Sequence, residues 1–189
     1  MDDYQESSVD ERYVCPITGL KQWELEILRT SWLQIVGVRN ARIVETATSL
    51  VLWMFHNIPN IQQRMALVVT NRDNRSMLYC DGVFLFHALA VIQSLHRIVH
   101  VSHNPEVLEK ELRRIIAIHV NCNPTVGIEY FSHFRRKFHV LLLERLKTTI
   151  DDERIRVWNV LLNKLCYLLY EEEFNLNESK ARGRCCSIL

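Results

Sequence analysis

Apolar residues recur every three or four positions along most of this chain, which is the spacing of one face of a helix. The first such segment follows Thr18, whose hydroxyl is expected to cap the helix, and it ends at Gly37. A second segment runs from about Arg39 to His56, and Pro59 stops it because the residue before a proline is pushed out of the helical region. The apolar positions of these two segments are Leu25, Leu28, Trp32, Ile35, Ile43, Ala47, Leu50, Met54 and Phe55.

The second half of the chain predicts further helices. The segment from about Met77 to Val99 is apolar almost all round, so it is expected to be packed on several sides. Asn104 and Pro105 mark the next helix start, and a polar break at 121–124 separates that helix from another with apolar residues at helical spacing. The last helix is expected to open near Asp151. No segment alternates with a period of two, so the predicted fold is all-α with six to eight helices.

Composition and charge narrow the class of protein. Only 5 glycines and 4 prolines occur in 189 residues, which disfavours a loop-rich sandwich or a linker protein. We predict an acidic, disordered extension over residues 1–17, a single domain over 18–174 and a basic tail over 175–189. The net charge of +1 gives no reason to expect nucleic acid as a partner. The start lacks a signal peptide and no apolar run is long enough for a bilayer, so we expect an intracellular domain.

The chain end fits a lipidation motif. Its last four residues form a CaaX-like box in which Cys186 is the expected prenyl acceptor, and Cys185 is placed for palmitoylation. Lys180, Arg182 and Arg184 precede the box and form the basic companion that a single lipid requires for stable membrane binding. These features predict attachment to the inner leaflet, at the cytoplasmic face of a membrane.

Motifs for nucleotide binding, serine hydrolysis, zinc proteolysis and dithiol redox chemistry do not occur, which leaves eight histidines as candidates. His96, His100 and His103 have a spacing that could hold zinc, but no carboxylate or thiol completes the site, so a polar helix end is the preferred reading. His87 and His119 each interrupt an apolar face on two successive long helices. A lone histidine on such a face is usually a satisfied core residue, whereas two suggest a metal or cofactor held between the helices.

At these positions the chain resembles the globin family over about residues 18–172. The segment 26–32 resembles the first globin helix, and 55–59 resembles the end of the second. Residues 84–87 resemble the distal histidine segment, and 108–119 the approach to the proximal histidine. The steps of 28 residues from Pro59 to His87 and of 32 residues from His87 to His119 fit neuroglobin-like globins. The acidic extension and the lipid box are more similar to the diverse invertebrate globins, such as those of nematodes.

The resemblance implies a globin fold packed around a haem pocket. His119 would be the proximal ligand of the haem iron, and His87 would face the other side, where it would contact a bound gas or ligate the iron itself. Met65 stands where globins carry a phenylalanine against the haem, which implies looser packing. The positions that match the lining of the pocket are Val51, Met65, Val91, Ile115, Val126 and Phe131. Placing Asp81 in the distal position instead is rejected, since an unpaired buried carboxylate is costly.

Two functions follow as expectations from the resemblance and the chain end. The first is a haem globin at a membrane surface that binds dioxygen or another diatomic gas, in a redox or sensing role with a possible redox partner protein. The second, suggested by Met65, is a haem-free globin fold that serves as a membrane-tethered interaction module. Whether the protein is an enzyme is left open, because the sequence predicts no substrate site beyond the haem.

Overall fold

The computed structural model describes residues 12–37, 40–57, 82–121 and 126–185. This part of the chain forms six helices and contains no strand beyond one isolated bridge between Val14 and Lys21. The helices are α1 (Gln22–Val36), α2 (Asn40–Asn57), α5 (Gly82–Val101), α6 (Pro105–Val120), α7 (Ile128–Leu146) and α8 (Glu153–Cys185). The predicted all-α class is therefore confirmed.

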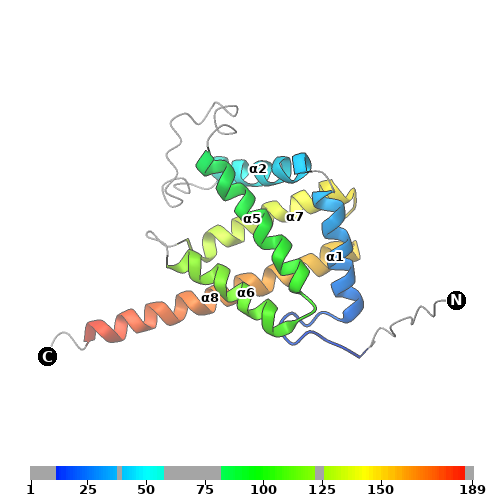
Figure 1. The fold of residues 1–189 in the computed structure, drawn as a ribbon. Helices are drawn as coiled ribbons and strands as arrows, with labels where there is room; N and C mark the ends of the chain where they lie inside the picture. Colours follow the sequence, from blue (N-terminus) through cyan, green and yellow to red (C-terminus); the bar gives the residue numbers. More distant parts are fainter. Residues whose placement is uncertain (1–11, 38–39, 58–81, 122–125, 186–189) are drawn as a thin grey trace.

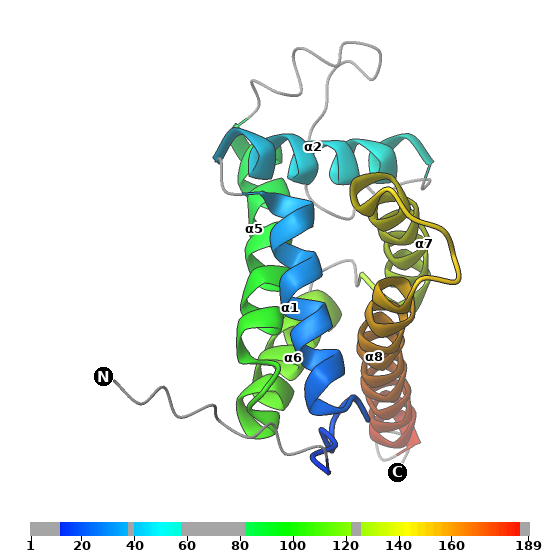
Figure 2. The same cartoon turned by 90° about the vertical axis from the view of Figure 1, so that its right-hand side faces the viewer.

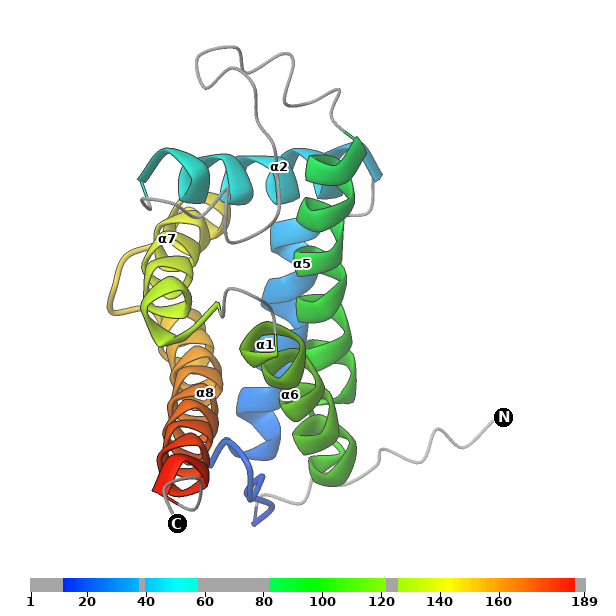
Figure 3. The ribbon, with the colours of Figure 1, turned by 90° about the vertical axis from the view of Figure 1, so that its left-hand side faces the viewer.

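Figure 1 shows how the six helices are arranged. Their buried side chains form a single apolar core. Helix α2 crosses the ends of α1, α5 and α7 at a steep angle, while α6 lies against both α5 and α8 (Figures 2 and 3). Helix α1 packs against α8, α7 and α5, so the two ends of the described domain meet in the core. This arrangement places α5 and α6, which carry the two candidate histidines, side by side.

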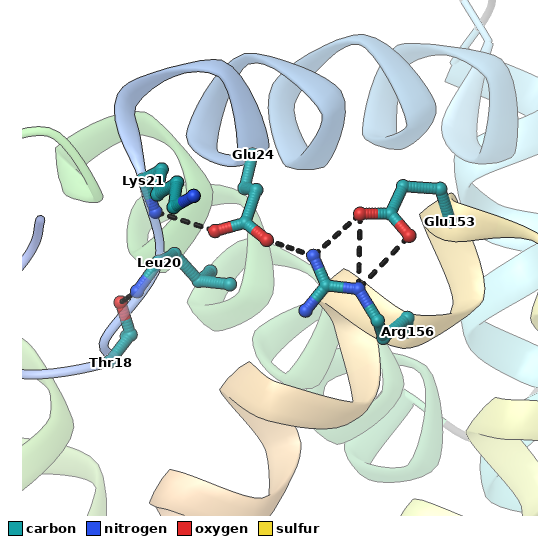
Figure 4. Close-up of polar contacts among 6 residues, drawn as sticks. All are labelled: Thr18, Leu20, Lys21, Glu24, Glu153 and Arg156. Carbon is teal, nitrogen blue, oxygen red and sulfur yellow. Dashed lines mark hydrogen bonds and ion pairs between the residues drawn. The ribbon is translucent and has the colours of Figure 1, made fainter. Parts of the chain in front are cut away.

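The start of α1 differs from the prediction. Its N-cap is Lys21 and not Thr18, whose hydroxyl instead accepts a hydrogen bond from the Leu20 amide at 3.2 Å in the preceding turn. The Glu24 carboxylate accepts the Lys21 amide at 2.6 Å and so satisfies a donor just ahead of the helix (Figure 4). Glu24, a residue of the first turn of α1, therefore takes the capping role that was expected of Thr18.

Glu24 is also the buried end of a charged contact between the first and last helices. Its other carboxylate oxygen pairs with the guanidinium of Arg156, which also binds Glu153 at 2.6 Å (Figure 4). Because Glu24 is buried, this pairing offsets the cost of removing its charge from water. The contact joins α1 to the first turn of α8.

The other helix boundaries follow local sequence signals. Asn104 caps α6 by accepting the Val107 amide at 3.2 Å, and Pro105 occupies the first turn, as predicted. Gly37 ends α1 with a positive φ of 66°, a conformation that glycine adopts without steric cost. These predictions are confirmed because each depends only on neighbouring residues.

The described structure begins before residue 18 and continues after residue 174. Cys15 lies in the core, and its amide binds the Leu20 carbonyl at 2.8 Å, so packing begins before residue 18. Helix α8 continues past residue 174 to Cys185 and projects beyond the other helices (Figure 1). The described helices include none with both the length and the apolar character needed to cross a bilayer. Met65 and Cys186 lie outside the described residues.

The start of α8 supports a prediction about stability and pH. Asp152 accepts the Arg154 amide at 2.8 Å in the manner of an N-cap, and the Arg154 guanidinium at 2.6 Å. The hydrogen bond from Arg154, followed by that from Thr148, holds the pKa of Asp152 well below its usual range. Because the folded-state pKa is depressed, the stabilisation is present above the unfolded pKa of about 4 and is lost as the pH falls through the folded value.

We therefore expect Asp152→Ala to lower the free energy of unfolding by about 1 kcal/mol at neutral pH, and by progressively less below about pH 4. Urea denaturation across this pH range measures the effect. Asp151→Ala, at the exposed neighbouring position, is the matched control and should have little effect. An Asp152→Ala penalty that stays constant on acidification would contradict this account.

Candidate functional site

His119 lies in the last turn of α6, a helix that packs against α5 and α8. Its Nδ1 lies 2.7 Å from the carbonyl oxygen of Ile115, one turn earlier. Since a carbonyl oxygen only accepts, Nδ1 must carry the proton, and the lone pair of Nε2 is then free for a metal. Phe131 at the start of α7 packs edge-on against the imidazole at 4.9 Å between ring centroids. The ring is therefore fixed both by a hydrogen bond and by an aromatic contact.

His87 lies on α5, which packs against α6. Its Nε2 is buried and has no hydrogen-bond partner within the described structure. Burial, and secondarily the electrostatic influence of His119, lowers the pKa of His87 to about 4. An orphaned polar atom in the interior is costly, so this nitrogen marks a place where a ligand or cofactor would supply a partner.

Burial also lowers the pKa of His119, and the hydrogen bond to Ile115 only partly opposes that effect. Both imidazoles are therefore neutral at physiological pH, and a neutral imidazole is the form that binds a metal ion. Because α5 packs against α6, the fold brings these two residues, 32 positions apart in the sequence, into one region. The pair thus offers two imidazole groups within one apolar region.

The predicted lining positions fall in three places. Ile115, Val126 and Phe131 are buried around His119, and the Val126 amide donates to the His119 carbonyl at 3.1 Å. Val91 is half-buried on α5, one turn after His87, and Val51 is fully buried in α2. The structure thus gathers the first three around His119 and places Val91 beside His87. These are the apolar side chains expected around a hydrophobic planar cofactor.

Glu173 is a residue near this site that sequence reasoning missed. Its carboxylate, on α8, accepts the Ile128 amide at 3.2 Å, 45 positions earlier, and so satisfies a donor at the start of α7. The preceding residue, Gly127, leaves room for this contact, because a Cβ there would lie 1.7 Å from the Glu173 oxygen. Glu173 therefore holds the first turn of α7, which carries Phe131. No local pattern marks such a long-range cap.

The other histidine cluster lies elsewhere, at the far end of α5. His96 Nδ1 accepts the indole N–H of Trp32 at 3.0 Å, and its ring stacks on that of His100. Both border a surface pocket that also includes Arg97, Val101, Val107 and Glu111. In the part of the chain that the structure describes, no three His, Cys, Asp or Glu side chains are grouped to hold a metal ion. The hydrogen bond from Trp32 gives His96 a role in packing α1 against α5.

The fold and the site define an all-α protein with a two-histidine site suited to a metal-bearing cofactor. A model of the globin family matches residues 54–169. A protein described as a globin from Biomphalaria glabrata is 24% identical over 148 residues, which cover 76% of this chain and 93% of that protein. The chain belongs to the globin family.

A solved structure supports the same fold. A double mutant of myoglobin from Aplysia limacina aligns with a TM-score of 0.56 and 14% sequence identity, covering 76% of this chain and 94% of that chain. Globins typically bind haem and, through it, diatomic gases such as dioxygen. The observed residues fit that group, because His119 presents an unprotonated Nε2 and His87 carries a buried nitrogen without a partner.

Proposed function

We propose that the protein holds haem through His119 and binds dioxygen or another diatomic gas, in a redox or sensing role at a membrane surface. The observation that supports the proposal best is the state of the two imidazoles. The proton of His119 is held on Nδ1 by Ile115, and the Nε2 of His87 is buried without a partner. Haem, when bound, supplies the iron centre for gas binding and electron transfer.

The surrounding residues orient the site and exclude water. Phe131 restricts rotation of the His119 ring, while Ile115 and Val126 close the apolar region beside it. On the other side, His87 and Val91 share one face of α5 at a spacing of one turn. The neutral His87 has two possible roles: donating a hydrogen bond to the bound gas, or ligating the iron through Nε2. In the second role His87 would compete with a gas for the iron, which would favour electron transfer to a redox partner protein.

The absorption spectrum of the reduced protein, without added ligand, decides between these roles. If His87 ligates the iron, the wild type should show sharp low-spin bands, and His87→Leu should convert them to a broad high-spin band. If His87 is a hydrogen-bond donor, the wild type should be high-spin and His87→Leu should release dioxygen about tenfold faster, as expected for loss of one hydrogen bond. His103→Leu, at an exposed position between α5 and α6, is the control.

The same experiment tests the haem-free alternative. A protein purified with supplied haem that shows no Soret band would overturn haem binding and favour a globin fold used only for interaction. A His87→Leu variant that changes neither the spectrum nor the gas release rate would remove His87 from the site.

We further propose that a prenyl group on Cys186 tethers the domain to the inner leaflet, with palmitoyl on Cys185 and the basic residues Lys180, Arg182 and Arg184 as companions. Intact mass of the full chain from eukaryotic cells should show the lipid, and Cys186→Ser should abolish it and release the protein from the membrane fraction. A wild-type mass without any lipid would contradict the tether.

A further inference from the structure

The distal half of α8 presents an aromatic face to solvent. Tyr167, Tyr170 and Phe174 are 54%, 56% and 53% exposed, and their spacing of three and four residues places them in one stripe along the helix. The opposite side of the same turns packs into the domain through Leu165, Leu168 and Leu169. Helix α8 is therefore apolar on two sides, only one of which the described domain covers.

We propose that this aromatic face docks on the lipid surface of a membrane, next to the lipid-bearing chain end. The inference rests on the proposed tether through Cys186. Helix α8 is continuous to Cys185, which lies 11 residues, or about three turns, beyond Phe174. The backbone at Cys185 thus faces the same side of the helix as the aromatic stripe. A palmitoyl group on Cys185, the proposed companion lipid, would bring this side of the helix toward the bilayer.

The chemistry of the face suits the interface between lipid and water. Tyrosine and phenylalanine combine an apolar ring with tolerance of the headgroup region, as the aromatic belts of membrane proteins show. Tyr167 keeps its polar contacts at the edge of the stripe, with Lys164 Nζ 5.2 Å from its ring centroid and Glu171 bonded to its hydroxyl. The hydroxyl of Tyr167 therefore already has a partner on the same helix.

The charges around the face favour an anionic membrane. Beyond Asn177, three basic residues outnumber the single acid Glu178, a net charge of +2. Among the acids that precede Phe174, Glu173 accepts a hydrogen bond from the Ile128 amide. Glu172 lies about 160° around the helix from Phe174, on the side away from the lipid. Glu171, which is bonded to the Tyr167 hydroxyl, and Glu178 lie about 60° and 40° around the helix from Phe174, so they border the face and reduce the attraction of the basic chain end for an anionic surface.

A second copy of the chain is the less suitable occupant. Half of three aromatic side chains amounts to about 200–400 Å². Two such faces would bury less than the roughly 1,000 Å² that a specific dimer needs. The same area is sufficient for a lipid surface, because a single lipid chain binds marginally and needs only a modest second contribution.

Docking also fixes the orientation of the domain. Glu173, adjacent to Phe174, holds the first turn of α7, and that turn places Phe131 against His119. Because the aromatic face lies opposite the side of α8 that packs into the domain, docking would place α8 between the bilayer and the part of the domain that carries His119.

Vesicle partitioning of the full lipidated chain tests the face. Vesicles of phosphatidylcholine with about one third phosphatidylserine serve as the probe. The variant Tyr167→Ser/Tyr170→Ser/Phe174→Ser should reduce the partition coefficient by about 10- to 100-fold. The matched control Leu33→Ser/Val140→Ser/Ile150→Ser removes exposed apolar side chains from α1, α7 and the turn after α7, and should change partitioning less than about twofold. Circular dichroism checks that both fold.

The possible results test the aromatic face of α8 separately from the lipid tether at Cys186. Equal partitioning of the aromatic variant and wild type, while Cys186→Ser detaches, overturns the aromatic face and leaves the tether standing. A wild type without lipid overturns the tether, and the face must then bind vesicles on its own or fail. A dimer of the wild type in solution that the aromatic variant dissociates would show that a second copy is the occupant. Independently, Phe174→Trp should shift tryptophan emission to the blue on vesicle addition, and no shift would contradict docking.

Discussion

Replacing His119 with alanine should release haem from the protein. When the variant is purified with supplied haem and passed through gel filtration, its Soret band should be lost. The Nε2 of His119 is the ring nitrogen available to a metal, because Nδ1 is hydrogen-bonded to the Ile115 carbonyl and Phe131 packs against the ring. Loss of an outer contact alone costs a metal site about 10–100-fold in affinity, so loss of the ligand itself should accelerate haem release by at least about 100-fold.

Two variants make this result specific. His139→Ala removes another half-buried histidine, whose Nδ1 lies 3.2 Å from Asn159 Oδ1 on α8, and should retain haem as the wild type does. His119→Gly, supplied with free imidazole, should regain a Soret band if the imidazole enters the space that the side chain leaves. Stoichiometric haem in His119→Ala would show that another residue holds the iron.

Trp158→Ala should produce the largest loss of stability, about 3–5 kcal/mol in the free energy of unfolding. Trp158 is fully buried on α8, and its ring lies 5.7 Å from that of Trp32 and 5.3 Å from that of Phe138, between centroids. Its indole N–H donates to Ser31 at 2.9 Å, and Ser31 in turn donates to the Leu28 carbonyl at 3.0 Å. One side chain thus joins α1, α7 and α8, so alanine leaves both a cavity and a lost hydrogen bond.

Urea denaturation of the haem-free protein measures this loss without the contribution of the cofactor. Trp158→Phe keeps most of the ring and loses only the hydrogen bond, so it should cost about 1–2 kcal/mol. Trp23→Ala, at a largely exposed position on the same α1 that Trp158 contacts, should cost less than about 1 kcal/mol. A Trp158→Ala penalty as small as that of Trp23→Ala would mean that the domain closes over the cavity.

The sequence predicts the helices well where neighbouring residues decide them. Asn104 and Pro105 start α6, Gly37 ends α1, and the apolar spacing in α7 matches the side chains that the structure buries. It fails at Thr18, because the hydroxyl there has a competing partner in the Leu20 amide. Local signals also gave no indication that α8 would continue to Cys185, since the polar residues after Leu176 lack the apolar repeat.

For the site, the sequence predicts residues and not their contacts. His87 and His119 stand out as polar interruptions of apolar faces, and the globin resemblance supplies their roles. The free Nε2 of His119 depends on the Ile115 carbonyl, and the lowered pKa of both rings depends on burial. How deeply a side chain is buried where two helices cross depends on both helices. The apolar pattern of one helix therefore does not predict how deeply its histidine is buried.

The sequence by itself determined the all-α class, the order of the helices and the pair of histidines. Periodicity records which face of a helix is buried, and these features need no more than that. The tertiary structure decided which distant residues meet: Glu24 with Arg156, Glu173 with Ile128, and Trp158 with Ser31. It also decided that α8 leaves an aromatic face uncovered. Such contacts depend on the crossing angles and offsets of packed helices, which many side chains set jointly.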